Sequence, residues 1–278
     1  MRYRKGFISI SDSRDIPMLL LIRDSRAISS SQLISELMLD KVESNSRSIH
    51  WRLNRLVANG MVQRLGNDRS YGEPVFSITH EGLSVLEYKG HALLALGSHL
   101  KSIVAEPEIP HTLELNAIRF SLKSSGLLVS WKTELQIISE NLVDCGMATK
   151  DYDSVVTIRY DNRVVRFAIE YERTAKSAAR YREICQTIKD DRATRLVLYL
   201  SANQEIMYLL TQELRSLQNK VAFGLASLFR IQQLSAPMVV IRSAPTVLPL
   251  CDILAELPTA PESYAASPVD KGHNASVN

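Results

Sequence analysis

Apolar residues in the first third of the chain recur every three or four positions in three successive segments, which is the spacing of one helix face. Two short apolar runs around a polar loop follow, and they are typical of a β-hairpin. Asn59-Gly60 favours a helix end because both residues tolerate positive φ angles. We predict helices over residues 14–24, from Ser29–Ser31 to Met38 and over 45–58, strands over 61–65 and 74–78, and a fourth helix from Thr79.

The pattern changes after Glu106–Pro110, a proline-containing segment that we interpret as a linker. Helical and strand patterns then alternate, and residues 195–200 form an unbroken apolar run, as expected for a strand buried on both faces. We predict helices over 111–124, 174–190 and 203–219, strands over 127–137, 195–200 and 237–241, and a hairpin over 150–172. The fold class is therefore α/β (α+β overall), with domains at 1–105 and 106–257 and a disordered tail at 258–278.

The predicted hairpin carries the candidate chemistry. Asp161-Asn162 is a pair that forms two-residue turns, and such a turn sets the pairing of both strands. In that register Asp153 lies opposite Glu170 and Asp151 lies opposite Glu172, and all four carboxylates share one sheet face. Repulsion disfavours such a cluster unless a cation is present, so we predict a Mg2+ or Mn2+ site. The alternative is a solvated hairpin end at which water screens the repulsion.

Composition and charge exclude few functions. The 278 residues are 45% hydrophobic and 23% charged, which is ordinary for a globular protein, and the net charge is only +3. A nucleic-acid surface must therefore be local. Cys145, Cys185 and Cys251 lack metal-ligand spacing and suit a reducing compartment, and we expect Cys185 in the core. We find no signal peptide or membrane segment and expect a soluble, cytoplasmic protein.

One face of the third predicted helix is polar and basic. Arg47, His50, Trp51, Asn54 and Arg55 follow one another at i, i+3, i+4, i+7 and i+8, so they form one stripe. We predict that the four polar members contact DNA. We expect Trp51 in the core instead, under the hairpin, because tryptophan is highly buried on average. The alternative for the whole stripe is a solvated helix face.

Positive charge is concentrated around this helix. Between Lys41 and Gly72, six basic residues stand against two acidic ones, and this local charge of +4 suits phosphate neutralisation. Arg69 lies in the hairpin loop and is expected to touch the DNA backbone or minor groove. The three helices, the hairpin and the frame from Asn59-Gly-Met-Val to Ile78-Thr-x-x-Gly resemble the winged helix-turn-helix family. That resemblance implies that the third helix enters the major groove of duplex DNA.

The order of elements in the second domain resembles the core of the PD-(D/E)xK nuclease superfamily, a restriction-endonuclease-like mixed sheet flanked by helices. That family places an acidic residue at the start of one strand and Glu-x-Lys near the end of the next. Asp153 and Glu170 match these positions, but Glu172 stands at the lysine position. The resemblance implies Asp153, Glu170 and Glu172 as catalytic metal ligands. It implies Lys176 as a displaced catalytic cation and Asp151 as a further metal ligand.

Three sequence blocks narrow this resemblance: His111-x-x-x-Leu-Asn-Ala-x-Arg, Asp151-Tyr-Asp-x-Val and Glu170-Tyr-Glu-x-x-x-Lys-x-x-x-Arg-Tyr. Behind a winged helix, they resemble the MobC-type plasmid relaxases and the related replication-relaxation proteins over about residues 14–200. The resemblance implies recognition of a plasmid transfer origin in double-stranded DNA and nicking of that DNA, with accessory mobilisation proteins as partners. One or two metal ions would activate water for phosphodiester cleavage.

Two functions stay open from the sequence. The first is a metal-dependent DNA-nicking relaxase, which is favoured because four carboxylates are kept together near Lys176. The second is a catalytically inactive, DNA-binding regulator of replication or transcription, which is favoured by Glu172 at the lysine position. A transcriptional regulator with a ligand-sensing domain is disfavoured because no apolar pocket signature is present.

Overall fold

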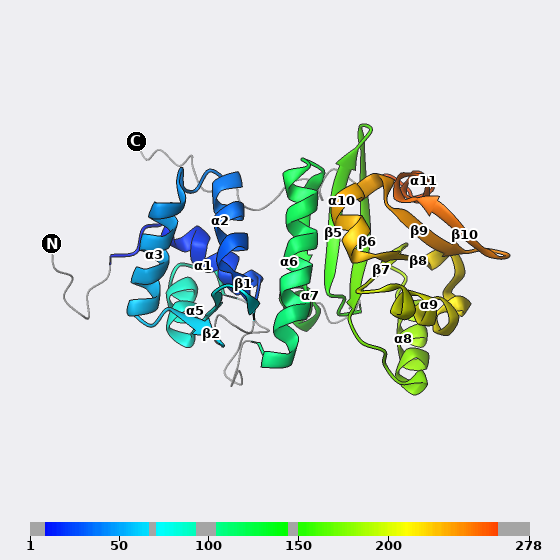
Figure 1. Cartoon of the computed structure of the whole chain (residues 1–278), viewed down its shortest axis with the longest axis horizontal. Coiled ribbons are helices and arrows are strands. Elements are labelled where there is room, and N and C mark those ends of the chain that lie inside the picture. Colours follow the sequence, from blue (N-terminus) through cyan, green and yellow to red (C-terminus); the bar gives the residue numbers. More distant parts are fainter. Residues whose placement is uncertain (1–8, 67–70, 93–103, 144–149, 261–278) are drawn as a thin grey trace. The chain divides into compact units, whose positions relative to one another are not determined.

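The computed structural model of the chain describes residues 9–66, 71–92, 104–143 and 150–260 (Figure 1). These residues divide into two compact units. The first unit holds the chain up to Phe120 together with Ile138–Val143, and the second holds Ser121–Ile137 and the chain from Asp144 on. A three-stranded sheet belongs to the first unit and a seven-stranded mixed sheet to the second, so the predicted mixed α/β class is confirmed.

The first unit combines helices with an antiparallel sheet of strand order β1-β3-β2. The two strands of the predicted hairpin and all four predicted helices are present. The short strand β1 was not predicted, because two residues are too few to show an alternating pattern. The elements are α1 (Asp15–Asp24), β1 (Ile28–Ser29), α2 (Ser30–Leu39), α3 (Ser46–Ala58), β2 (Val62–Leu65), β3 (Val75–Ile78) and α5 (His80–Tyr88).

Side-chain caps explain where α2, α3 and α5 begin. The Ser29 hydroxyl accepts a hydrogen bond from the backbone N–H of Gln32, and the Gln32 side chain accepts one from the backbone N–H of Ser29. This capping box begins α2. Asn45 and Thr79 cap α3 and α5 with their side chains. Gly60 has a φ of 73° just after α3, which explains why that helix ends there.

The segment predicted to be a linker is helical. It forms the 3-10 helix η2 (Glu106–Glu108) and the beginning of α6 (Ile109–Ser124). Pro110 is tolerated because it lies in the first turn of α6, where backbone N–H groups have no helical partners. The predicted domain division at residues 105–106 therefore lies before a helix whose first part belongs to the first unit.

Two buried side chains anchor α6 in the first unit. The Asn116 amide donates to the Ala27 carbonyl at 2.7 Å. The Arg119 guanidinium donates to a Glu36 carboxylate oxygen at 2.7 and 3.0 Å, and both side chains are buried. Breaking such a buried pair by removing one partner is strongly destabilising, so these contacts hold the first part of α6 in place.

The second unit is a sheet of strand order β10-β9-β8-β7-β6-β5-β4, in which β6, β7 and β8 are parallel and the other neighbours are antiparallel. Figure 1 labels α7 to α11 and β5 to β10. The elements from β4 on are β4 (Leu128–Thr133), α7 (Glu134–Val143), β5 (Ser154–Tyr160), β6 (Arg163–Glu172), α8 (Ala178–Asp190), β7 (Val197–Ser201), α9 (Gln204–Glu213), η3 (Arg215–Lys220), β8 (Val221–Leu225), α10 (Ala226–Gln232), η4 (Gln233–Ser235), β9 (Pro237–Ile241), β10 (Pro245–Pro249) and α11 (Leu250–Ala255). Of α7, the part Ile138–Val143 belongs to the first unit.

The β5–β6 hairpin has the predicted register. Tyr160 pairs with Arg163 and Ser154 pairs with Ile169. The turn residues Asp161 and Asn162 have φ angles of 46° and 58°, as a two-residue hairpin turn with positive φ at both positions requires. The sheet face that carries Glu170 is therefore the one that the sequence indicated.

Two parts of the second unit differ from the prediction. The strand predicted over 127–137 ends at Thr133, because Thr133 and Gln136 exchange hydrogen bonds through side chain and backbone and so cap α7. The elements β8, α10, β10 and α11 were not predicted. Residues 261–278 of the predicted tail lie outside the described residues, but the Ala260 N–H donates to the Val164 carbonyl at 2.7 Å.

The core of the second unit lies between the sheet and two helices, α8 and α9. Tyr181, Cys185 and Ile188 on α8 pack against the sheet residues Ala168 and Tyr199, and α9 adds further apolar side chains. The prediction that Cys185 lies in the core is confirmed. Within the described residues, none of the helices has both the length and the apolar character needed to cross a bilayer.

Candidate functional sites

The first candidate site is the outward face of α3. Arg47, His50 and Asn54, which were predicted to contact DNA, are exposed along this helix. His50 Nδ1 lies 2.8 Å from the Ser46 carbonyl oxygen, so the imidazole is held against its own helix. Arg64 on the neighbouring strand β2 is also exposed. The site thus combines exposed cations with exposed hydrogen-bonding side chains.

Trp51 lies on this face and not in the core. Its side chain is 49% exposed, so the expectation that it packs under the hairpin is wrong. The guanidinium groups of Arg52 and Arg55 lie 5.8 and 5.0 Å from the centre of its ring, and cation–π attraction holds such pairs together. The core side of α3 is supplied instead by residues with smaller side chains, Ile49, Leu53 and Leu56.

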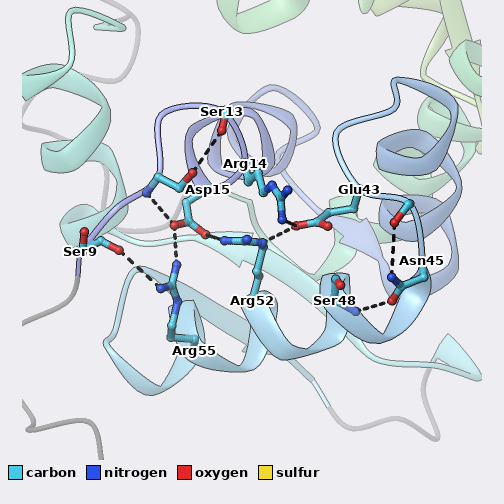
Figure 2. Close-up of polar contacts among 11 residues, drawn as sticks. Ser9, Ser13, Arg14, Asp15, Glu43, Asn45, Ser48, Arg52 and Arg55 are labelled. Carbon is cyan, nitrogen blue, oxygen red and sulfur yellow. Dashed lines mark hydrogen bonds and ion pairs between the residues drawn. The ribbon is translucent and has the colours of Figure 1, made fainter. Parts of the chain in front are cut away.

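Arg55 differs from the other members of the predicted stripe. Its guanidinium donates to the Asp15 carboxylate, which is fully buried, and the Arg55 side chain is only 12% exposed. Figure 2 shows Arg55 and Arg52 converging on Asp15 from α3. Arg52 also binds Glu43, a second buried carboxylate. The ion pair of Arg55 with Asp15 therefore lies within the first unit.

Arg69, the predicted contact from the hairpin loop, lies outside the described residues.

The second candidate site is the end of the β5–β6 hairpin. The paired ladder ends at Ser154 and Ile169, and the next residues are Asp153 and Glu170. The Asp153 carboxylate accepts a hydrogen bond from the backbone N–H of Tyr171 at 2.7 Å. Asp153 and Glu170 are close enough for the charge of one to act on the pKa of the other. The central pair of the predicted carboxylate cluster is thus brought together.

Glu170 is the most perturbed carboxylate of this pair. Burial and the neighbouring charge of Asp153 raise its pKa to about 7, although the positive charges of Lys150 and Lys176 act in the opposite direction. The Lys150 ammonium forms an ion pair with the Glu170 carboxylate and lies 4.4 Å from the centre of the Tyr152 ring. Both partners of the ion pair are only 14% exposed, so water screens it little.

Glu172 and Lys176 form a second ion pair beside the first. Glu172 is buried, whereas the Lys176 side chain is 38% exposed. The prediction placed Lys176 at the start of a helix, but α8 begins at Ala178 with Ser177 as its cap, so Lys176 lies in the segment before it. The predicted proximity of this lysine to the carboxylates is nevertheless present.

Asp151 is exposed at the same end of the hairpin. Within the part of the chain that the structure describes, no three His, Cys, Asp or Glu side chains come together as a metal-binding group. The Tyr199 hydroxyl is buried without a hydrogen-bond partner among the described residues, and Tyr199 pairs with Glu170 in the sheet. Orphaned buried hydroxyls usually mark the place of a water molecule or an ion.

Sequence reasoning missed Lys150 and Tyr199 as neighbours of the carboxylates. Lys150 precedes β5, where strand alternation gives no information about side-chain direction. Tyr199 lies within the apolar run that predicted β7, and nothing in that run distinguishes its hydroxyl. Only the pairing of β7 with β6 reveals its position beside Glu170.

A family model described as replication-relaxation matches residues 19–196, which is more than half of the chain. The chain belongs to the replication-relaxation family. The matched range includes α3 as well as the β5–β6 hairpin with both of its ion pairs. Searches of curated proteins and of solved structures found no match. Membership of the replication-relaxation family suggests a role in plasmid replication or relaxation.

Proposed function

We propose that this member of the replication-relaxation family binds duplex DNA at a plasmid transfer origin through the outward face of α3 and nicks it at the Asp153–Glu170 site. The first unit supplies recognition and the second supplies the chemistry. Within the family, we assign the chain to the MobC-type relaxases. We propose other mobilisation proteins as its partners.

DNA binding is supported by the arrangement of the first unit. Helix α3 comes after α2 in the chain and the β2–β3 hairpin follows it, an order that resembles that of a winged helix-turn-helix module. Such modules insert this helix into the major groove. Arg47, His50 and Asn54 would meet the DNA there. Neutralisation of phosphates by the surrounding basic residues would supply affinity that falls as salt is added.

The observation that carries the nicking proposal is the close approach of Asp153 and Glu170, both of which are largely shielded from solvent. Bringing two like charges together in a buried place raises free energy unless cations offset it. Lys150 and Lys176 provide that offset in the present structure. A carboxylate pair of this kind can bind a divalent cation, and the nearby ammonium groups can bind a phosphate beside it.

Two carboxylates suffice for Mg2+, which keeps several water molecules and binds through one or two carboxylates together with substrate phosphates. Asp153 and Glu170 would hold the ion, with Glu172 as the next available carboxylate. The orphaned Tyr199 hydroxyl fits a bound water in this place. When bound, Mg2+ or Mn2+ supplies an activated water and neutralises phosphate charge. Lys176, the more exposed lysine, would face the scissile phosphate and offset the charge that develops there.

A second candidate is a DNA-binding regulator of replication or transcription without catalytic activity. It is favoured by Glu172, which stands where related nucleases carry lysine and which is held in an ion pair with Lys176. In this alternative the two ion pairs are structural, and they keep the end of the hairpin folded.

Nicking of supercoiled plasmid DNA distinguishes the two candidates. The probe is a negatively supercoiled plasmid that carries the DNA flanking the gene, incubated with Mg2+ or Mn2+ and analysed on an agarose gel. We expect the parent protein to produce open circles, and we expect Asp153→Asn and Glu170→Gln to abolish them. Glu183→Gln is the matched control, because Glu183 is an exposed carboxylate on α8. A parent protein that binds this DNA and never nicks it supports the regulator.

The DNA interface is tested separately by salt dependence. Arg47→Ala should weaken binding to duplex DNA and lower the slope of log affinity against log salt by roughly 0.9, the value for one phosphate contact. Fluorescence anisotropy of a labelled duplex measures both quantities. The control is Arg180→Ala, which removes an exposed arginine from α8 in the other unit. An unchanged slope in Arg47→Ala would remove this residue from the interface.

A further inference from the structure

Trp51 is a large apolar side chain at the middle of a polar, basic surface. It is 49% exposed, with Arg47 and His50 before it and Asn54 after it on the same face of α3. Exposed tryptophan in such a setting is uncommon, since its large apolar area favours burial. The charge around it complements an anionic partner and not an apolar one, and duplex DNA combines an anionic backbone with apolar groups in its major groove.

Two anchored cations lie against the indole of Trp51. The Arg55 guanidinium lies 5.0 Å from the ring centre and binds the buried carboxylate of Asp15. The Arg52 guanidinium lies 5.8 Å from the ring centre and binds Glu43 and, at 3.1 Å, Asp15 (Figure 2). Neither arginine is more than 13% exposed. The two guanidinium groups therefore restrict the ring while its outer surface stays open to solvent.

We propose that Trp51 is a base-contacting residue of this protein and that its indole packs on thymine methyl groups in the major groove, with Arg52 and Arg55 as positioning residues. The inference rests on the proposed DNA-binding function. The methyl group of thymine is the apolar feature that the major groove offers, and apolar side chains read it by contact. A ring that is already restricted loses little conformational freedom on binding.

This assignment changes the role of Arg55. A guanidinium that binds a buried carboxylate is held away from phosphates, so Arg55 acts on DNA through the orientation of Trp51. Arg47 on the same helix is the matched comparison, because it is exposed. Arg55→Gln should therefore leave the slope of log affinity against log salt unchanged, whereas Arg47→Gln should lower it by roughly 0.9.

Fluorescence tests the contact directly. The chain contains two tryptophans, Trp51 and Trp131, so Trp131→Phe leaves Trp51 as the only reporter. Quenching of its emission by acrylamide is measured with and without a short duplex of alternating dA and dT at low salt, while anisotropy of the labelled duplex reports binding. We expect the bound duplex to reduce quenching several-fold. Unchanged quenching in a complex that anisotropy shows to be formed overturns the inference.

The thymine methyl is tested with a second duplex in which dU replaces dT, because the two duplexes differ in that methyl group alone. We expect the parent to prefer the dT duplex by roughly tenfold, a discrimination typical of one good base contact. Trp51→Ala should abolish the preference and Trp51→Phe should keep part of it. Tyr88→Ala, which removes a tyrosine that is 89% exposed on α5, should leave the preference unchanged.

The outcomes separate this inference from the proposed function. Equal affinity of the parent for the two duplexes overturns methyl recognition, while an effect of Arg47→Gln on the salt slope would still support α3 as the interface. A parent protein that binds neither duplex at low salt overturns the DNA-binding proposal itself. Circular dichroism of each variant establishes that a lost preference does not come from unfolding.

Discussion

The two candidate sites bury carboxylates against cations in different ways. In the first unit, the buried Asp15 and Glu43 bind arginines of α3, whereas in the second unit Glu170 and Glu172 bind Lys150 and Lys176. A guanidinium is planar and offers several donors in a fixed fork, so it orients what it binds. An ammonium on a flexible stem is a compact charge that moves easily. The arginine network builds a rigid surface, and the lysine pairs suit a site in which charges are exchanged.

The largest expected effect comes from breaking the arginine network. Asp15→Ala leaves Arg52 and Arg55 without their shared carboxylate in a place that water reaches poorly. Removal of one partner from a buried ion pair destabilises a protein by about 3–5 kcal/mol, and we expect a loss of that size in the free energy of unfolding of the first unit. Urea unfolding followed by Trp51 emission in the Trp131→Phe protein measures it.

A nearby surface pair provides the control for this measurement. Asp12 lies three residues before Asp15 and pairs with Lys89, but its side chain is 74% exposed. Exposed ion pairs contribute about 0–1 kcal/mol, so Asp12→Ala should change the unfolding free energy little. If Asp15→Ala costs no more than Asp12→Ala, the arginine network does not orient α3 as described.

The next largest effect is on the rate of nicking, and it tests the role of Lys176 in the second ion pair. Lys176→Ala should lower the nicking rate by about 10²-fold, a usual loss when one group that stabilises developing charge is removed. DNA affinity should stay nearly constant, and Lys176→Arg should restore little, because a planar fork does not replace a compact ammonium. Time courses of plasmid nicking measure the rate.

Lys189→Ala, at an exposed position on α8, is the control for the nicking experiment. A Lys176→Ala protein that nicks at the parent rate would remove Lys176 from the chemistry. Lys150, the partner of Glu170, would then be the lysine to substitute next.

The smallest effect concerns Asp191, a carboxylate of the second unit that is held by hydrogen bonds from a hydroxyl and from the backbone. Burial raises the pKa of Asp191, but hydrogen bonds from Thr194, Tyr152 and the backbone outweigh it, so the pKa is lowered overall. A lowered folded-state pKa stabilises the protein above the unfolded-state pKa, and this contribution is lost as pH falls through the folded-state value. Asp191→Asn should therefore cost about 1–2 kcal/mol at neutral pH and progressively less in acid.

Urea unfolding of the parent and of Asp191→Asn between pH 7 and pH 3 measures this difference. Asp190→Asn is the matched control, because the neighbouring Asp190 is exposed. Its carboxylate accepts hydrogen bonds from the Gln186 side chain, one turn earlier on α8. A difference between parent and Asp191→Asn that stays constant with pH would mean that protonation of Asp191 is not its source.

Local signals predicted the first unit and the hairpin well. The Ser29 cap and Gly60 act within a few residues of the chain, so each can be read without knowledge of the tertiary fold. The same holds for Asp161-Asn162, whose positive φ angles set the register that brings Asp153 beside Glu170. The pairing of these two carboxylates is the part of the candidate site that the sequence anticipated.

Features that depend on distant contacts were not predicted. The contacts of Arg52 and Arg55 with Asp15, which lies more than thirty positions earlier, were not predicted because no periodicity reports such a contact. Tyr199 joins the carboxylates only through the parallel pairing of β6 with β7. The end of β4 is a different case, since Thr133-Glu-Leu-Gln136 is a capping-box signature that was present in the sequence and overlooked.

The contacts of α6 determine where the chain can be cut into folded fragments. A fragment that stops at residue 105 would lose Asn116 and Arg119, leaving the Ala27 carbonyl and the Glu36 carboxylate buried without these partners. A fragment that continues through Ser124 keeps both side chains and ends where the helix ends. A fragment that keeps these contacts of the first unit is therefore defined by two internal hydrogen-bonding residues and not by the proline-containing segment that first suggests a cut.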